Sequence, residues 1–108
     1  MTTARETMDR TITEEELLIA VTDALTIFGW RWSHIRRSDR AITMGHPGLP
    51  DIIAARHGRL KFYELKTAKG QLTQDQFAWQ LDMPPNSYAV EYRLVRPADL
   101  DDVIASLR

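Results

Sequence analysis

Two acidic residues and a lysine in the middle of the chain have the types and the spacing for metal-assisted chemistry. Asp51 begins one short apolar segment, and Glu64 and Lys66 lie near the end of the next. Between these segments, His57-Gly58 is typical of a two-residue hairpin turn. Counting outward from that turn places Asp51 directly opposite Glu64, with their Cβ atoms about 5 Å apart. Lys66 would share their face, because alternate residues of a strand point to the same side.

Two carboxylates at this separation repel each other unless a cation lies between them. Oxygen ligands of this kind suit a hard divalent ion such as Mg²⁺ or Mn²⁺. An ammonium group beside such an ion could orient a water molecule or stabilise the charge that develops on a phosphate. The residues therefore favour metal-assisted attack of water on a phosphodiester. The alternative is an exposed ion-pair cluster in which Lys66 neutralises both acids.

Local signals along the chain predict the elements that must position these residues. Capping boxes at Thr13 to Glu16 and at Thr73 to Gln76 begin two helices, which Gly29 and Pro84-Pro85 would end. Pro97 suits the first position of a third helix. Strands are predicted over residues 30–37, 51–56, 59–66 and 88–95. The order α-β-β-β-α-β-α predicts an α/β domain with a central mixed β-sheet flanked by helices.

Length and composition indicate one small domain. The chain has 108 residues, no cysteine and a formal net charge of -1. We expect a flexible N-terminus over residues 1–10 and a single domain over residues 11–108. Because the sequence has neither an apolar run of ~20 residues nor a signal-peptide pattern, we expect a cytoplasmic protein without a membrane partner.

Charge is distributed unevenly along the chain. Residues 31–72 hold nine basic and three acidic side chains, whereas the parts on either side are acidic. A basic stripe of this kind can attract a polyanion, and the alternative is the ordinary scatter of surface charge. Arg36, Arg37, Arg40 and Lys69 are the candidates for contacts with nucleic-acid phosphates. The competing interpretation is that they belong to solvated loops.

The residues around the acidic pair resemble a known nuclease pattern. Pro50-Asp51 followed by Glu64-Leu65-Lys66 resembles the motif of the PD-(D/E)XK nucleases. The segment Gly48-Leu49-Pro50-Asp51, the loop from Lys66 to Gly70 and Gln76 at the start of the next helix resemble one branch, the VRR-NUC domain (virus-type replication-repair nuclease). This resemblance implies the restriction-endonuclease-like fold and a metal-dependent DNA endonuclease.

The resemblance spans about residues 16–101 and implies roles for individual residues. Asp51 and Glu64 match the metal-binding acids, and the backbone carbonyl of Leu65 matches a further ligand. Lys66 matches the catalytic lysine. The implied cofactor is Mg²⁺ or Mn²⁺.

Two residues on the predicted helices have two competing roles each. Gln76 matches a glutamine that supports the site from a helix N-terminus. Glu16 is the best match for an additional metal ligand, with Glu15 as the alternative because consecutive glutamates leave the register open. As members of capping boxes, however, Glu16 and Gln76 could each serve only to cap a helix.

The resemblance also implies a substrate and a setting. Small stand-alone members of this branch come largely from phages and bacteria, and some act as homodimers on branched DNA, like junction-resolving enzymes. We therefore expect a structure-selective endonuclease for branched DNA or Holliday-junction-like substrates in replication, recombination or repair. One small domain has little surface for reading bases, and a homodimer would bring two sites to one substrate.

Two other functions compete with a nuclease. The chain could be a non-catalytic module that binds DNA or a partner and retains the nuclease fold. The intact set of Asp51, Glu64 and Lys66 argues against this, because a site free to decay would lose members. The chain could also be a structural protein with an incidental acid–base cluster, whose stability Mn²⁺ would not change.

Overall fold

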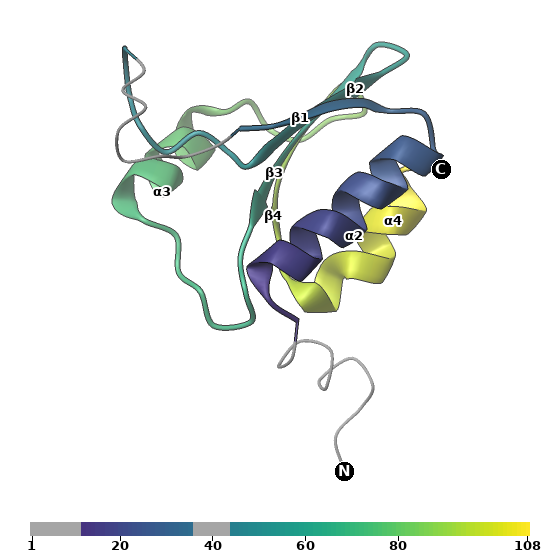
Figure 1. Cartoon of the computed structure of the whole chain (residues 1–108). Helices are drawn as coiled ribbons and strands as arrows, with labels where there is room; N and C mark the ends of the chain where they lie inside the picture. The colour runs from purple at the N-terminus through teal and green to yellow at the C-terminus, as the bar shows by residue number, and fades with distance from the viewer. Residues whose placement is uncertain (1–11, 36–43) are drawn as a thin grey trace.

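The computed structural model describes residues 12–35 and 44–108. The expected flexible N-terminus (residues 1–10) and the arginines Arg36, Arg37 and Arg40 lie outside the described residues. Within the described part, four strands form one mixed sheet in the order β1-β2-β3-β4 (Figure 1). The strands are β1 (Arg31–His34), β2 (Ile52–Arg56), β3 (Arg59–Leu65) and β4 (Val90–Val95). The first three pair antiparallel in sequence, and β3 pairs with β4 in parallel.

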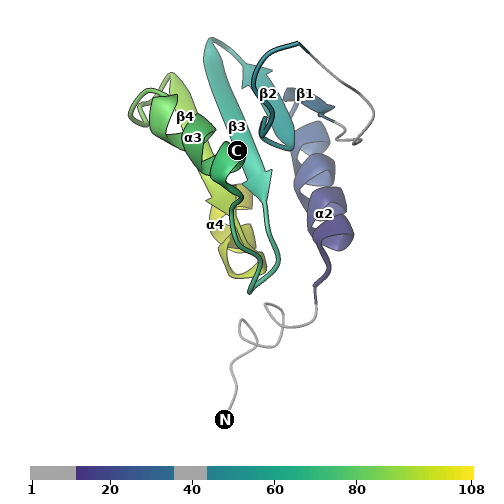
Figure 2. The ribbon, with the colours of Figure 1, turned by 90° about the vertical axis from the view of Figure 1, so that its left-hand side faces the viewer.

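Helices cover both sides of this sheet. Helices α2 (Glu14–Ile27) and α4 (Leu100–Ser106) pack on one side, and α3 (Gln74–Asp82) lies on the other, in front of the sheet in Figure 2. The predicted α/β class and element order are therefore confirmed for the described residues. None of these helices is long and apolar enough to cross a membrane.

Helix α2 begins and ends where the local signals predict. The Thr13 side chain accepts a hydrogen bond from the Glu16 amide (3.1 Å), and the Glu16 carboxylate accepts one from the Thr13 amide (3.4 Å). Gly29 has a φ of +76°, and the amides of Gly29 and Trp30 donate back to carbonyls of the last helical turn. These bonds form a Schellman motif, in which glycine adopts the left-handed conformation at low cost.

The turn between β2 and β3 determines how the two strands are aligned. His57 (φ +50°) and Gly58 (φ +79°) both have positive φ, as a type I′ hairpin turn requires. Ile52 pairs with Tyr63, and every pair of this ladder follows the predicted register. Continued by one residue beyond β2, the register places Asp51 opposite Glu64.

The hydrophobic core lies between the sheet and helices α2 and α4. Its members are Leu17, Val21, Ala24, Leu25, Trp30, Ile52, Ala54, Tyr63, Leu65, Val95, Leu100, Val103 and Leu107. Because Ile52 and Tyr63 face this core, alternation turns Asp51 and Glu64 to the opposite face of the sheet, the side of α3. The apolar face thus fixes which way the acidic pair points.

Strand β2 begins one residue later than predicted and β3 ends one residue earlier. Three further boundaries differ for a physical reason. Trp30 ends the α2 cap instead of opening β1. The strand predicted from Tyr88 begins at Val90, because the parallel register would place Tyr88 opposite Gly58 in the hairpin turn, where β3 has not yet begun. The third difference is at Pro97, which opens a 3₁₀ turn, η1 (Pro97–Asp99), and not α4 itself. The Asp99 carboxylate accepts from the Arg96 amide, and the Asp99 amide donates to the Arg96 carbonyl; these contacts tighten that turn.

Arg56 connects the ends of both core helices. Its Nη1 donates to the carbonyls of Phe28 (2.7 Å) and Leu107 (2.9 Å), and its guanidinium lies over the Trp30 ring at 4.6 Å. Phe28 and Leu107 are the C-cap residues of α2 and α4. One cation therefore satisfies the negative C-terminal ends of two helices.

We expect Arg56→Met to lower the free energy of unfolding by about 2–3 kcal/mol, because charge-assisted hydrogen bonds to half-buried carbonyls are lost. Urea denaturation would measure this change. The matched control is Arg31→Met, because Arg31 is exposed on the neighbouring strand. Equal stability of the two variants would contradict this role of Arg56.

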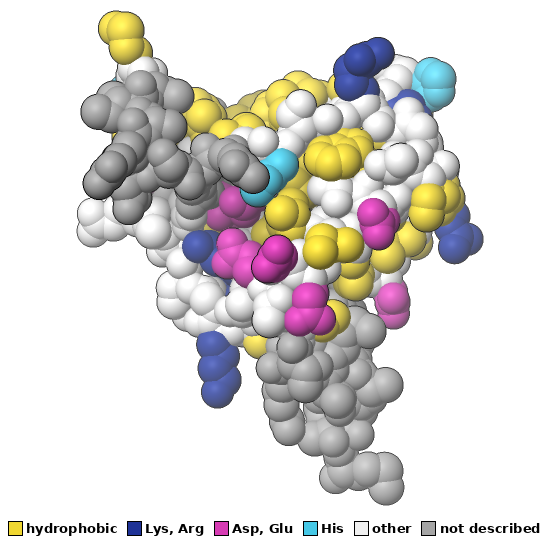
Figure 3. All heavy atoms as spheres, viewed as in Figure 1, with side chains coloured by type: hydrophobic (Ala, Val, Ile, Leu, Met, Phe, Trp, Pro, Cys, Tyr) yellow, Lys and Arg dark blue, Asp and Glu magenta, His cyan; other side chains and the backbone are white. Residues whose placement is uncertain are grey.

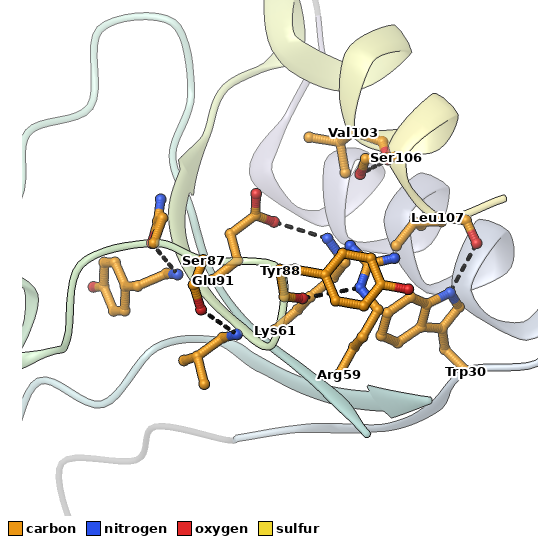
Figure 4. Close-up of polar contacts among 12 residues, drawn as sticks. Trp30, Arg59, Lys61, Ser87, Tyr88, Glu91, Val103, Ser106 and Leu107 are labelled. Atoms are coloured by element: carbon orange, nitrogen blue, oxygen red, sulfur yellow. Dashed lines mark hydrogen bonds and ion pairs between the residues drawn. The ribbon is translucent and has the colours of Figure 1, made fainter. Parts of the chain in front are cut away.

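Tyr63 is the buried phenol at the centre of the sheet. Burial raises the pKa of this phenol well above its ordinary value near 10, and the nearby Glu91 carboxylate acts in the same direction. Glu91 itself pairs with the buried Lys61 ammonium at 3.0 Å (Figure 4). The folded protein therefore holds the Tyr63 proton at pH values at which the unfolded chain releases it.

The stability that this proton contributes is present below pH 10 and is lost as the pH rises above 10. We expect the free energy of unfolding to fall there by up to about 1.4 kcal/mol per pH unit. Urea denaturation across the alkaline range would measure the slope. Tyr63→Phe should remove this part of the slope, and an unchanged slope in that variant would refute the assignment.

Candidate active site

Asp51 and Glu64 form a buried acidic pair on the α3 side of the sheet. The Asp51 side chain is 8% exposed and that of Glu64 is 1% exposed. Asp51 Oδ2 accepts a hydrogen bond of 2.6 Å from the backbone amide of Leu65, next to Glu64. This hydrogen bond fixes the Asp51 carboxylate against β3, the strand that carries Glu64, as the predicted pairing of the two acids requires. Burial of two carboxylates is costly unless a cation or donors compensate them.

Pro50 changes the hydrogen bonding of the strand opposite it. The Leu65 amide points toward β2, since it donates to Asp51, and the Leu65 carbonyl must point the same way. Continuing the register places Pro50 opposite Leu65. Proline has no N–H to donate to that carbonyl. The order Pro-Asp therefore ends the ladder and leaves the Leu65 carbonyl without a donor from the residue opposite it.

Lys66 follows β3 directly and lies half-buried on the same face as Glu64. Its backbone amide continues the parallel ladder by donating to the Val95 carbonyl at 3.0 Å. Its side chain runs past Gly70, where an added Cβ would lie 3.4 Å from Lys66 Cδ. This is an ordinary van der Waals distance, so the loop after β3 lies against the stem of the lysine side chain.

Arg96 holds that loop in place, which the sequence reasoning did not anticipate. Its Nη1 donates to the carbonyls of Thr67 (2.6 Å), Gly70 (2.8 Å) and Ala68 (3.3 Å). One guanidinium nitrogen thus gathers three carbonyls of the turn that follows Lys66. No local sequence signal distinguishes this arginine, because its partners lie 26 to 29 residues away in the chain.

Helix α3 is attached to the segment that precedes Asp51. Gly48 has a φ of +98°, and a Cβ placed there would lie 2.5 Å from the backbone carbon of Asp75. Trp79 Nε1 also donates to the Pro47 carbonyl at 2.9 Å. Gly48, the glycine of the G-x-P-D segment, is therefore required because the N-terminus of α3 comes too close to it to leave space for a side chain.

Gln76 occupies the first turn of α3 and is 1% exposed. Its Oε1 accepts from the Thr73 amide (2.9 Å), and its own amide donates to Thr73 Oγ1 (3.2 Å). The predicted capping box is confirmed.

Glu16 is exposed, and its carboxylate accepts from the Thr13 hydroxyl at 3.0 Å as well as from the Thr13 amide. Across residues 12–35 and 44–108, no group of three or more His, Asp or Glu side chains could hold a metal ion. The capping role of Glu16 is thus confirmed, whereas a metal role for Glu16 or Glu15 stays a prediction.

The basic residues predicted to bind phosphates are only partly described. Lys69 is exposed in the loop after Lys66. Arg36, Arg37 and Arg40 fall outside the described residues, so their role stays a prediction. Figure 3 shows acidic side chains near the N-terminal end of α2, whereas the basic side chains stand apart from one another over this face.

The donor atoms at the acidic pair fit a hard divalent cation. Asp51 and Glu64 supply carboxylate oxygens. Leu65 supplies a carbonyl oxygen that receives no hydrogen bond from Pro50, the residue opposite it. Mg²⁺ and Mn²⁺ prefer oxygen ligands and keep several water molecules. Such an ion would also compensate the two buried negative charges.

Comparison of the chain with protein-family models, with curated proteins and with solved structures finds no match. What the site can do therefore rests on its own geometry and chemistry.

We expect Gly48→Ala to loosen α3 from the rest of the protein, because the new Cβ would overlap the Asp75 backbone. The matched control is Gly45→Ala, which has a similar φ of +103° but no atom within 4 Å of its added Cβ. Both variants carry backbone strain of about 1–3 kcal/mol. Gly48→Ala alone should lose hydrogen-exchange protection in α3. Equal protection in the two variants would argue against the close approach.

Proposed function

We propose that this protein is a Mg²⁺- or Mn²⁺-dependent endonuclease that hydrolyses DNA phosphodiesters. The observation that carries the proposal is the acidic pair, because Asp51 and Glu64 are buried, oppose each other across β2 and β3, and lie beside Lys66. A chain that buried two carboxylates without a task for them would be less stable than one with apolar residues there.

Each residue has a distinct task in the proposed reaction. The bound ion would act as a Lewis acid on the scissile phosphodiester. Asp51, Glu64 and the Leu65 carbonyl would hold that ion. Lys66 would donate hydrogen bonds to the attacking water and to the phosphate oxygens on which charge increases. The water oxygen would form the new bond to phosphorus and release one proton to solvent, while the bond from phosphorus to the leaving ester oxygen breaks and that oxygen takes up a proton from solvent.

The fold fits the proposed family. A mixed sheet of four strands in the order β1-β2-β3-β4, with helices on both sides, is compatible with the restriction-endonuclease-like fold. The close approach at Gly48 and the capped Gln76 give physical reasons for two residues of the VRR-NUC pattern. We extend the proposal to that branch on these grounds.

The substrate and setting follow from the same proposal. The protein would act on branched DNA, such as Holliday-junction-like structures, as a homodimer during phage or bacterial replication, recombination or repair. Its working place would be the cytoplasm. A small domain that holds DNA mainly by its backbone would select structure over base sequence.

A labelled panel of duplex, single-stranded, flap and four-way-junction DNA, incubated with Mn²⁺, Mg²⁺ or EDTA, tests the proposal. Cleavage should require the metal, and Lys66→Ala should lower its rate roughly 100- to 1,000-fold. The control Arg93→Gln removes a charge outside the site and should cut normally. Absence of cleavage on every substrate, or equal cleavage by Lys66→Ala, would reject the nuclease.

Metal binding gives a second measurement that needs no DNA. At about 100 times its dissociation constant, Mn²⁺ should stabilise the protein by about 2.7 kcal/mol. Asp51→Asn should abolish the resulting rise in melting temperature, whereas the exposed carboxylate change Asp82→Asn should leave it intact. A rise of the same size in Asp51→Asn would place the metal elsewhere.

A further inference from the structure

An open pocket of about 520 Å³ lies at the opposite end of the β2–β3 hairpin from the acidic pair. Its lining includes Gly29, Arg31, Arg56, His57 and Arg59. Three arginines and a histidine therefore line one open hollow. We call this feature the hairpin pocket.

The positive charge of the hairpin pocket is held in place but not cancelled by acidic side chains. Arg59 lies over the Tyr88 ring at 4.5 Å and the Trp30 ring at 5.6 Å, and its Nε donates to the Tyr88 carbonyl (Figure 4). Arg56 is fixed by backbone oxygens and by Trp30. The ion pairs Lys61–Glu91 and Arg93–Asp99 do not involve these arginines, and among the described residues no ion pair joins Arg31, Arg56 or Arg59 to an acidic side chain.

Of the three arginines of the hairpin pocket, only Arg31 lies on the face of the sheet that carries the acidic pair, because Arg56 and Arg59 pair with each other on the core side. Arg31 pairs with Ala55 in the β1–β2 ladder, and Ala55 shares a face with Asp51 by alternation. Arg31, Ser33 and Ala55 are all exposed. An uncovered strip of β1 and β2 therefore leads from Arg31 toward Asp51. Asp51 lies four positions before Ala55 along the strand, which corresponds to a distance of about 13 Å.

We propose that the hairpin pocket is a second binding site for phosphate groups of the DNA backbone. Arginine forks match the geometry of phosphate oxygens, and Arg59, which stacking already orients, would lose little entropy on binding. A phosphate at Arg31 would lie about 13 Å from the acidic pair, which corresponds to about four base pairs along a duplex. This inference rests on the proposed function, because it assigns a second contact to the same DNA.

Binding of labelled duplex DNA, measured by fluorescence anisotropy in EDTA from ~50 to ~200 mM salt, tests the pocket without cleavage. Each lost phosphate contact makes the slope of log K against log salt shallower by about 1. We expect this change for Arg31→Gln and a larger one, up to about 2, for Arg31→Gln combined with Arg59→Gln. Arg93→Gln, the same substitution outside the pocket, should keep the wild-type slope. Melting temperatures would verify that all variants fold.

The outcomes separate this inference from the proposed function. Unchanged slopes in both pocket variants, or no DNA binding by the wild type, would overturn the hairpin pocket as a phosphate site. If the wild type also cuts DNA with Mn²⁺, the nuclease would stand without it. If slopes fall as expected but no metal-dependent cleavage occurs, the pocket would be supported and the nuclease rejected.

Discussion

The two-residue turn at His57-Gly58 sets the register of β2 against β3, and the site depends on that register. A slip by one residue would turn Asp51 into the core while Glu64 stayed on the outer face, because side chains alternate along a strand. Two constraints prevent the slip. The turn requires positive φ at both residues, and the core needs Ile52 and Tyr63 on its side. The acidic pair is therefore a product of turn geometry and hydrophobic packing together.

Contacts with the backbone assemble the remainder of the site. The Leu65 amide fixes Asp51, Arg96 gathers the carbonyls of the loop after Lys66, and Gly48 lets α3 approach the segment before Asp51. These contacts join segments that are distant in sequence. The acidic pair thus sits on a rigid hairpin, while the lysine loop and α3 are held against it by a few polar and steric contacts.

Features that depend on neighbouring residues could be predicted from the sequence. The two capping boxes, the left-handed Gly29 and the hairpin turn each have a short local signature, and each is present. Counting residues outward from the turn along both strands was enough to place Asp51 opposite Glu64. This part of the site was therefore accessible because its geometry propagates along a regular ladder.

Features that depend on distant partners could not be predicted. The carbonyls that Arg56 and Arg96 bind come from helix ends and a loop far along the chain. The short 3₁₀ turn at Pro97 arises because Asp99 turns back to Arg96. Tyr88 lies outside the predicted strand because its place in the parallel register falls opposite the hairpin turn, before β3 begins. Such choices are decided by tertiary contacts, which local propensity does not encode.

Pro50 has a consequence for how such a centre could be transferred to other proteins. The ladder of a hairpin normally continues for as long as both strands can exchange backbone hydrogen bonds. Each further pair would bring the ends of the two strands together and occupy their carbonyl groups. Proline stops this lengthening at one defined rung, just beyond the two acids. A designer could therefore place Pro-Asp opposite Glu-Leu at the open end of any tight-turned hairpin. The resulting three oxygen donors would need only a supporting face beneath them, and not this particular arrangement of helices.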